Sequence, residues 1–478
     1  MNIKIIKLII GVCIIGVISL SGQTTITLEQ MLSETRANAS SIKIAKTDIE
    51  IAAARLSLFK TDLKPNLGLD LLLPNFINTS TQVTQPDGSI AFQQVTQNNS
   101  SISLYASQNI AATGGQIFVQ SDLQRFDDFS NDVKQYNGVP IRVSLVQPLF
   151  GFNRFKWDKK ILKILQKESA SAYDIAIEDA QWRATVLYFD VLLAQANKEI
   201  ATTNKDVNEK LVKITKERFD LGKTSRDEWL QIDMSLKGAV LSENQAKNQV
   251  QQALNSLYTF MGNKEWKSDL VCTVPELTSQ IILDEYDLIQ KALKNRPEIL
   301  RYERELIEGD QNIAFTNSQF GISAQLFAGF GFARGSEDID EVYKNPFDEQ
   351  QIRFSISMPL IDWGKKKEAV KIATLEKANT HQRILQETLE LENRVRSLVA
   401  QFVQIQNDLT LLQEIKDVAG ERFDISNQRY TLGNISITDL TLAQREKDQT
   451  LRDYIQALKV YWSTYFEIRT LCGITTLN

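Results

Sequence analysis

The stretch RFDLGKTSRDEWLQID, residues 218–233, decides the fold, and it has a counterpart in RYTLGNISITDLTLAQ, residues 429–444. Each copy follows a long charged segment with helical periodicity, breaks at a glycine and restarts at a serine. The glycines are Gly222 and Gly433, and the serines are Ser225 and Ser436. A glycine just past a helix end and a serine as the next N-cap are typical of a turn between antiparallel helices. We therefore predict two helical hairpins.

The two hairpins belong to an internal repeat. Arg218 and Arg429 are 211 positions apart (429 − 218), and the same spacing joins other landmarks, among them Pro148 with Pro359 and Gly262 with Gly473. Near the start of each half the spacing is larger, because EQMLSETRANASSI aligns with DLIQKALKNRPEI at an offset of 257. The first half therefore carries 46 extra residues (257 − 211), which we assign to a hairpin around Gly114-Gly115.

The first 22 residues have the pattern of a secretory signal peptide. Two lysines precede an apolar run, and small residues follow it at the expected cleavage point. The expected organisation is a signal peptide (residues 1–22), a first repeat (23–262), a linking equatorial segment (263–284) and a second repeat (285–478). The tips lie at 218–228 and 429–439.

Long helices dominate each repeat. An apolar seam with steps of three and four residues runs through 159–221 and again through 365–432, which is typical of coiled-coil packing. Shorter helical patterns cover 27–60, 225–261 and 436–471. Helices of this length, folded back at the two tips, predict an antiparallel coiled-coil architecture.

Between the helices, apolar residues recur at every second position, which indicates strands. Four stretches alternate in the first half (67–73, 102–106, 117–123 and 141–145) and two in the second (322–332 and 352–358). Polar stretches at 75–99 and 127–138 are expected to be loops. No apolar run after Gln23 reaches the length of a spanning helix, so a membrane crossing would have to use strands closed into a barrel.

Composition excludes several function classes. Without Lys4 and Lys7 the chain has 52 basic residues (54 − 2) against 59 acidic ones, which argues against nucleic acid as a partner. His381 is the only histidine, and Cys272 and Cys472 are the only cysteines after the signal peptide. The sequence therefore predicts no catalytic constellation, metal site or cofactor, and it leaves open whether the two cysteines pair.

Helix, strands, long helix, glycine tip and return helix, repeated behind a signal peptide, resemble the TolC family of outer-membrane efflux proteins. The most specific marks are the two tips, followed by the strand ends Gln147-Pro148-Leu149 and Met358-Pro359-Leu360. The resemblance implies an α+β membrane channel, with a helical tunnel in the periplasm and a transmembrane β-barrel completed by a homotrimer in the outer-membrane lipid. It implies a periplasmic adaptor (membrane fusion) protein and an inner-membrane RND or ABC transporter as partners.

The resemblance also implies site residues at the tips. A periplasmic gate would contain Asp227, Glu228, Tyr430 and Asp439, and adaptor docking would use Leu221, Gly222, Ser225, Leu432, Gly433 and Ser436. Three-fold symmetry would gather the gate carboxylates into a ring that attracts cations. The alternative role of Glu228 and Asp439 is to stabilise a helix N-terminus. An arginine of the best-known member is replaced by Ile435, which removes one expected lock.

A second function class stays open at this point: an exported coiled-coil scaffold or adhesin without a lumen. Each strand group lies at the same place between helices in both halves, which favours the channel, an exit duct for an efflux or type I secretion system. The substrate, the energy source of the inner-membrane pump and the place of the extra hairpin are not evident from the sequence.

Overall fold

The computed structural model describes residues 24–262, 270–276 and 281–477. The expected signal peptide and most of the residues between 263 and 280 lie outside these ranges. Two units can be distinguished: one contains residues up to 40, 180–281 and 401–466, and the other contains 41–179, 282–400 and 467–478. Each unit draws on both halves of the sequence.

The helices follow the predicted pattern, with two breaks that the sequence analysis missed. The first predicted helix is two helices separated at Ala39, and the corresponding helix of the second half is interrupted at Arg296, ahead of Pro297. Proline at the first helical position lacks the N–H that a continuous helix needs, so a new helix starts there. The helices are α1 (Leu28–Asn38), α2 (Ser40–Thr61), α3 (Arg154–Asp220), α4 (Arg226–Met261), α5 (Glu285–Asn295), α6 (Pro297–Gln319), α7 (Lys365–Thr431) and α8 (Ile437–Cys472).

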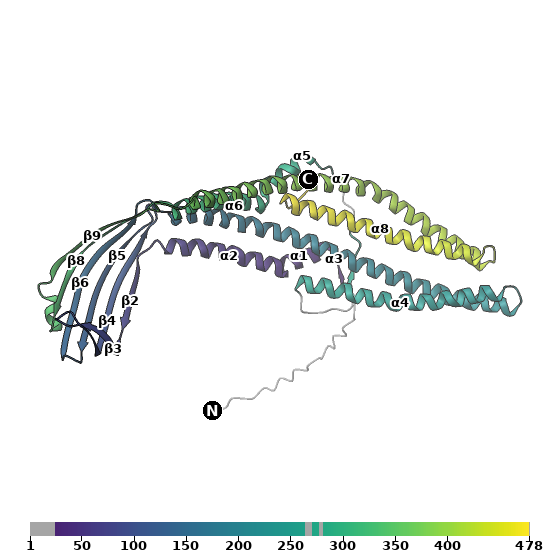
Figure 1. The fold of residues 1–478 in the computed structure, drawn as a ribbon. Coiled ribbons are helices and arrows are strands. Elements are labelled where there is room, and N and C mark those ends of the chain that lie inside the picture. Colours follow the sequence, from purple (N-terminus) through teal and green to yellow (C-terminus); the bar gives the residue numbers. More distant parts are fainter. Residues whose placement is uncertain (1–23, 263–269, 277–280, 478) are drawn as a thin grey trace, which may run out of the picture. The chain divides into compact units, whose positions relative to one another are not determined.

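One antiparallel sheet holds seven strands, and Figure 1 shows them fanned side by side. Six follow the order β2-β4-β5-β6-β8-β9, and β3 pairs with the far part of β4. The strands are β2 (Asn66–Leu72), β3 (Phe76–Thr84), β4 (Ile90–Ile110), β5 (Gly115–Asp128), β6 (Val133–Pro148), β8 (Ser323–Ser336) and β9 (Phe347–Ser357); a 3-10 turn, η1 (Ile339–Tyr343), joins the last two.

The expectation of polar loops was wrong at both places. Residues 76–84 and 90–98 form a two-stranded ribbon, and the connection between β5 and β6 shrinks to 129–132 because both strands run longer than predicted. The ribbon consists largely of Asn, Gln, Thr and Ser, so it lacks the apolar alternation by which strands are recognised. Backbone hydrogen bonds between its two strands hold the ribbon together instead.

The extra residues of the first half form an integral part of the sheet. An offset of 257 maps β2 onto β8, and an offset of 211 maps β6 onto β9. In the second half these two strands pair directly, whereas in the first half β4 and β5 lie between them. The extra hairpin around Gly114-Gly115 thus joins the sheet between β2 and β6.

A small parallel pair completes the strands. β1 (Thr24–Ile26) pairs with β7 (Leu270–Cys272). β7 lies in the linking segment 263–284, for which the sequence predicted no regular structure. Tyr188 of α3 fastens the pair, since its hydroxyl donates to the carbonyls of Ile26 (3.0 Å) and Thr273 (2.6 Å). Burial raises the pKa of Tyr188 to about 12, so the phenol stays protonated as a donor.

None of the described helices combines the length and apolar character that crossing a membrane would require.

Candidate functional site: the helical tips

Both tips have the same backbone geometry. Gly222 and Gly433 have φ of +70° and +83°, a conformation that side chains bearing a Cβ rarely adopt. At each tip the glycine N–H donates to the carbonyl three residues back, and the next N–H donates to the carbonyl five residues back. This pair of bonds is the Schellman motif, which satisfies carbonyls left unpaired at the helix end. The sequence thus dictates the same sharp reversal twice.

The serines cap the returning helices as expected. Ser225 Oγ accepts from the N–H of Glu228 (3.1 Å), and Ser436 Oγ accepts from the N–H of Asp439 (3.2 Å). The Asp439 carboxylate in turn accepts from the backbone N–H of Ser436 (3.3 Å) and its hydroxyl (2.7 Å). Within the chain Asp439 is therefore bound in a reciprocal cap.

Glu228 has a different environment, because it links the two tips. Its carboxylate accepts from the hydroxyl of Tyr430 (3.4 Å) and from Thr224. The Tyr430 hydroxyl also lies 3.2 Å from Thr215 Oγ1 of α3. One phenol at the end of α7 thus contacts both the last turns of α3 and the first turn of α4.

Tyr430 sits in an apolar core at the tips. Its side chain is 1% exposed and packs in a cluster with Leu211, Ile232, Phe423, Ile437 and Leu440. Burial raises the pKa of the Tyr430 phenol, and the negative charge of Glu228 raises it further, while Thr215 and Arg218 oppose the shift. The phenol is therefore held protonated, the state in which it can donate to a carboxylate.

Arg218 supplies the positive charge at this junction. Its guanidinium donates to the carbonyls of Tyr430 (3.4 Å) and Thr431 (3.0 Å), and it lies over the Tyr430 ring at 5.6 Å from the centroid. A cation near the last carbonyls of a helix interacts favourably with the negative end of the helix dipole. Ile435 is partly buried and packs against the apolar cluster around Tyr430.

Among the predicted site residues, the structure brings Glu228 and Tyr430 together and leaves Asp227 exposed beside them. Sequence reasoning missed Thr215, Thr224 and the contact of Arg218. No local signal identifies Thr215 as a partner of a residue 215 positions away, because that proximity arises only when the two hairpins pack together.

The outermost residues of the tips are apolar and exposed. Leu221 is 70% exposed and Leu432 is 75% exposed. Next to the first tip, the aromatic rings of Phe219 and Trp229 stack with their centroids 6.3 Å apart. Exposed leucines on rigid turns are suited to contact an apolar partner surface.

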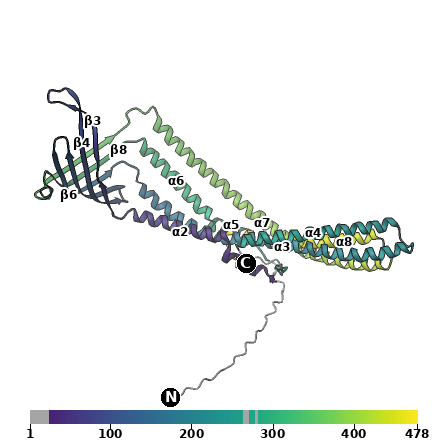
Figure 2. The same cartoon turned by 90° about the horizontal axis from the view of Figure 1, so that it is seen from below.

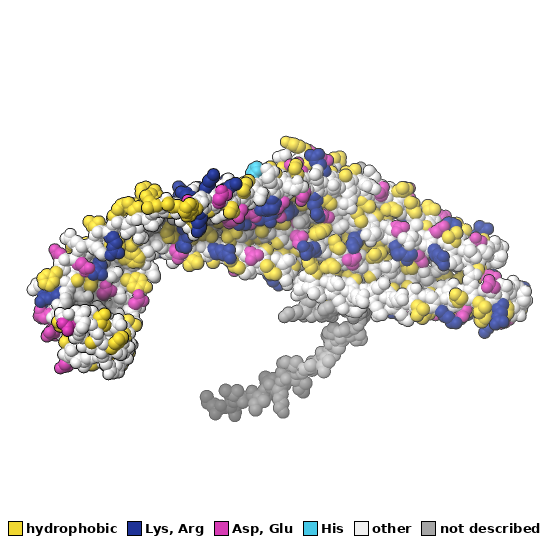
Figure 3. All heavy atoms as spheres, viewed as in Figure 1, with side chains coloured by type: hydrophobic (Ala, Val, Ile, Leu, Met, Phe, Trp, Pro, Cys, Tyr) yellow, Lys and Arg dark blue, Asp and Glu magenta, His cyan; other side chains and the backbone are white. Residues whose placement is uncertain are grey.

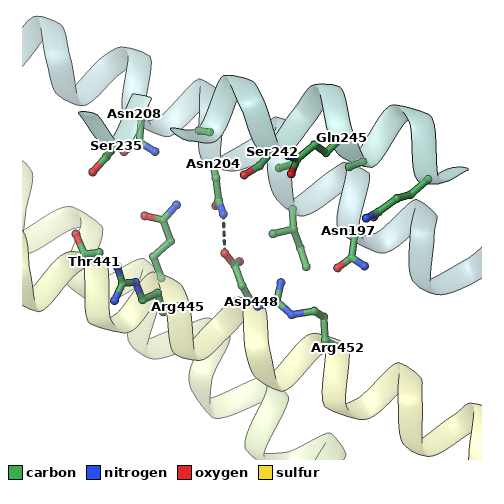
Figure 4. A pocket seen from close by; sticks show the side chains of 16 residues that line it. Asn197, Asn204, Asn208, Ser235, Ser242, Gln245, Thr441, Arg445, Asp448 and Arg452 are labelled. Carbon is green, nitrogen blue, oxygen red and sulfur yellow. Dashed lines mark hydrogen bonds between the residues drawn. The ribbon is translucent and has the colours of Figure 1, made fainter. Parts of the chain in front are cut away.

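A polar pocket of about 470 Å³ lies farther from the tips, between α3, α4 and α8 (Figure 4). Asn204 Nδ2 donates to Asp448 Oδ2 at 2.6 Å. Asp448 is 5% exposed, and its buried Oδ1 has no hydrogen-bond partner among the described residues, although Lys447 Nζ lies 3.8 Å away. Burial raises the pKa of Asp448, although Asn204, Lys447 and Arg452 oppose the rise. Figure 4 shows Arg445 and Arg452 beside it on α8.

We expect Asp448→Asn to stabilise the protein at pH 7 by about 1 kcal/mol. Because folding raises the pKa of this carboxyl, its favourable contribution is present at acidic pH and is lost as the pH rises through the folded value. The gain should therefore shrink at pH 4 in thermal unfolding. Asp453→Asn, an exposed carboxylate on the same helix, is the matched control and should change little at either pH. A greater gain at pH 4 than at pH 7 would contradict this assignment.

Among the described residues, no group of three or more metal-binding side chains comes together.

The sequence matches the Outer membrane efflux protein family over residues 31–263 and 288–473. The chain belongs to this family. The two matched stretches correspond to the two halves of the repeat and cover most of the chain, so the protein is an outer-membrane efflux channel that extends into the periplasm. This membership disfavours the alternative of an exported scaffold or adhesin.

Solved structures of outer-membrane proteins share the fold. The Campylobacter jejuni CmeC outer membrane channel superposes with a TM-score of 0.69 at 16% identity, covering 99% of this chain and 94% of that one. The Vibrio cholerae outer membrane protein VceC gives 0.66 at 13% identity (93% and 96% covered). The open state of the Neisseria gonorrhoeae MtrE outer membrane channel gives 0.62 at 15% identity (94% and 89%). No curated protein matches this chain by sequence.

Proposed function

We propose that this efflux protein works as a homotrimer and serves as the exit duct of a tripartite efflux or type I secretion system. Substrates would arrive through a periplasmic adaptor and an inner-membrane transporter and leave without chemical change. The observation that carries the proposal is the sheet, which has one apolar face, one polar face and two unpaired edges.

One face of the sheet is lined by apolar side chains along five of its strands. Pairing places Leu67, Ala106, Val119, Val143 and Phe330 in one row over five strands. Most of these side chains are exposed in the single chain. Apolar side chains in such a row fit contact with lipid.

The opposite face is polar along the neighbouring row. That row joins Gly68, Tyr105, Gln120, Arg142, Gly331 and Glu349 over all six strands. Arg142 and Glu349 form an ion pair across it, above Gly331. Polar and small side chains on this face fit a water-filled lumen.

The edges of the sheet are the reason to propose a trimer. Among the described strands, β2 pairs only with β4 and β9 pairs only with β8, so both outer edges carry unpaired backbone groups. Exposed backbone donors and acceptors are too costly in lipid, so the edges need partners there. Edge β9 of one copy against edge β2 of the next would supply them and close the ring with three copies.

Large apolar side chains also gather where the sheet meets the helices. Leu360 and Trp363, in the connection from β9 to α7, are 85% and 93% exposed, and Figure 3 shows a yellow cluster at this junction. Tryptophan is enriched where a membrane meets water. We place the periplasmic surface of the outer membrane at this level.

The tips supply the proposed gate and docking surface. Glu228 and Tyr430 hold the two hairpins of one chain together, and Leu221 and Leu432 with their glycines and serines face outward for the adaptor. Asp227 and Asp439 would add charge at the same constriction.

We expect the purified mature protein to require detergent and to elute with the mass of a trimer by light scattering. In planar bilayers it should conduct ions. A water-soluble monomer without conductance would contradict the proposal. An Ile352→Asp, Phe354→Asp variant, which puts charge on the apolar face of β9, should lose assembly because charged side chains on a lipid-facing surface destabilise a membrane sheet. Gln351→Asp, on the polar face of the same strand, is the matched control and should assemble normally.

A further inference from the structure

Basic side chains gather where the two longest helices meet the sheet. β6 leads into α3 through residues 149–153, and β9 leads into α7 through residues 358–364, so both helices begin beside the sheet (Figures 1 and 2). Residues 154–163 and 362–371 contain nine basic and three acidic residues, whereas the whole chain has 54 basic and 59 acidic ones. This level of a negatively charged protein therefore carries a concentrated positive charge.

The connections that precede these helices carry the same apolar pattern in both repeats. At the offset of 211, three apolar positions correspond: Leu149 with Leu360, Phe150 with Ile361, and Phe152 with Trp363. Four of these side chains are at least 65% exposed: Phe150, Leu360, Ile361 and Trp363. Apolar side chains that protrude in both repeats indicate an apolar environment outside the chain.

Basic residues follow the apolar ones in both repeats. At the same offset, three basic positions in the first two turns of the helices correspond: Arg154 with Lys365, Lys156 with Lys367, and Lys160 with Lys371. We call these six basic and six apolar side chains the junction belt. Figure 3 shows dark-blue side chains beside the yellow cluster at this junction. The belt thus has an apolar part next to the sheet and a basic part along the helices.

The turn before α7 holds Trp363 away from the rest of the chain. The Asp362 carboxylate accepts from the N–H groups of Gly364 (3.0 Å) and Lys366 (3.1 Å), which fixes the turn. Trp363 has a φ of +52°, a conformation that residues with a Cβ rarely adopt, and its side chain is 93% exposed. Backbone strain of this kind is typical of functional positions. A tryptophan held outward in this way is suited to the boundary between membrane and water.

The basic part of the belt is largely available to an anion from outside the chain. Ion pairs at this level join Arg154 to Asp158 at 3.4 Å and Lys371 to Glu368 at 3.9 Å. Within the part of the chain that the structure describes, three exposed lysines of the belt form no ion pair: Lys156, Lys365 and Lys367. Lysines in a first turn also face the positive end of the helix dipole, so their charge does not stabilise the helices. An external anion would offset that repulsion.

We propose that the junction belt binds the headgroups of anionic phospholipids in the periplasmic leaflet of the outer membrane. A phosphatidylglycerol headgroup carries one net negative charge, which complements the unpaired lysines. A zwitterionic headgroup has its own ammonium group, which these lysines repel. Exposed apolar side chains beside the lysines favour a lipid over an acidic protein surface, because a lipid offers phosphate and hydrocarbon at adjoining depths. The inference rests on the proposed position of the membrane.

The spacing along the helices fits the depth of the headgroup layer. At about 1.5 Å per residue, Lys156 lies about 3 Å beyond Arg154 and Lys160 about 9 Å beyond it. The headgroup layer on one side of a bilayer is about 5–8 Å thick, and long lysine side chains extend their charge toward polar surroundings. With Trp363 at the level of the glycerol groups, the basic part of the belt therefore reaches the phosphates.

Trp363 supplies the probe for the test. The purified mature protein is reconstituted into phosphatidylcholine bilayers in which part of the lipid is brominated phosphatidylcholine or brominated phosphatidylglycerol, since bromine quenches tryptophan emission on contact. We expect brominated phosphatidylglycerol to bind at least about threefold more strongly at 0.1 M salt, because basic residues near a membrane surface attract anionic lipids. The preference should disappear at 1 M salt, where the screening length falls to about 3 Å.

A triple variant tests whether the belt causes this preference. Lys156→Gln, Lys365→Gln, Lys367→Gln removes the three lysines without an ion pair and keeps Trp363 as the reporter. We expect the preference for phosphatidylglycerol to fall at least about twofold, while quenching by brominated phosphatidylcholine is unchanged. Folding should be retained, because glutamine is nearly as good a helix former as lysine.

A matched control removes the same charge elsewhere in the same unit. Lys43→Gln, Lys46→Gln, Lys294→Gln changes three exposed lysines. Lys46 lies 15 residues (61 − 46) before the end of α2, and Lys294 adjoins Asn295, whose carbonyl accepts from Ser171 Oγ, 17 residues (171 − 154) into α3. These lysines are thus about 20 Å or more from the sheet along the helices, so the preference should stay unchanged.

Each contrary outcome overturns a stated part of the proposal. Equal binding of the two lipids to a conducting trimer at 0.1 M salt overturns the anionic lipid site alone. An equal fall in the control variant overturns the belt as its location. A preference that inorganic phosphate removes at constant ionic strength indicates a site for small anions and overturns the lipid assignment.

The same experiment separates this proposal from the proposed function. Absence of quenching by either brominated lipid overturns the position of the membrane, and with it the lipid site. A protein that forms neither trimer nor channel overturns the proposed function. If the triple variant does not assemble, the lipid preference of the unaltered protein and its salt dependence still decide.

Discussion

The double variant Glu228→Ala, Tyr430→Phe is expected to raise the resting conductance of the channel at least about tenfold. It removes the bonds from Tyr430 to Glu228 and Thr215 while keeping the aromatic ring in its apolar cluster. Each such bond contributes about 0.5–1.5 kcal/mol, and about 1.4 kcal/mol corresponds to a tenfold change in a population. Three chains would lose these bonds together.

Single-channel recording in planar bilayers measures this effect. Glu217→Ala, an exposed carboxylate near the end of α3, removes a charge without touching the link between the tips and should leave the resting conductance unchanged. Equal opening in the control would mean that net charge, not the bond to Tyr430, keeps the tips closed. An unchanged conductance in the double variant would reject Tyr430 and Glu228 as the lock.

Adding Asp439→Ala to the same channel tests the proposed ring of carboxylates. If Asp439 and Glu228 line the constriction, their loss should shift the reversal potential in a salt gradient away from cation selectivity. If Asp439 acts only in the cap with Ser436, the variant should lose about 1 kcal/mol of stability with selectivity intact. The bonds within one chain are compatible with both roles, because a capped carboxylate keeps its charge.

The second large effect is expected from Gly222→Val, Gly433→Val, which should abolish export while the trimer still assembles. Valine at positive φ costs about 1–2 kcal/mol at each tip. The space itself is open: nothing lies within 4 Å of a Cβ built at Gly222, and only the Arg218 guanidinium, at 3.7 Å, does so at Gly433. The backbone of the turn, and with it the positions of Leu221 and Leu432, would therefore change.

Two matched variants separate the turn from the docking surface. Asparagine tolerates positive φ, so Gly222→Asn, Gly433→Asn should keep the backbone while adding a side chain at the surface. Gly238→Ala, inside α4 and in open space, should be silent. Export is measured in cells and adaptor binding with purified protein. Full export by the valine variant would mean that the adaptor docks elsewhere.

The helical part of the fold could be predicted because its determinants are local. A regular apolar seam predicts a long helix wherever it lies, and glycine followed by serine predicts the same turn twice. The two tips accordingly lie where the sequence places them, with φ positive at both glycines. The repeat offsets likewise place an extra hairpin in the first half, although they do not give its neighbours in the sheet.

The remaining features depend on tertiary contacts. The β3–β4 ribbon has no buried face, so nothing in its sequence alternates, and β1 and β7 are three-residue strands that pair across 246 positions (270 − 24). The Tyr430–Thr215 contact and the Asn204–Asp448 bond join segments more than 200 positions apart. Such partners become neighbours only after the hairpins pack, which spacing along the chain does not encode.

The reactivity of Cys272 and Cys472 with thiol reagents can report on local unfolding of this protein. Cys272 and Cys472 are free thiols, each buried in a different unit, and burial raises the pKa of each to about 12. A protonated thiol in a closed core reacts slowly with alkylating reagents. Each cysteine is therefore modified only when its own unit opens, so the rates at the two positions report separately on the local stability of the two units, without any introduced label.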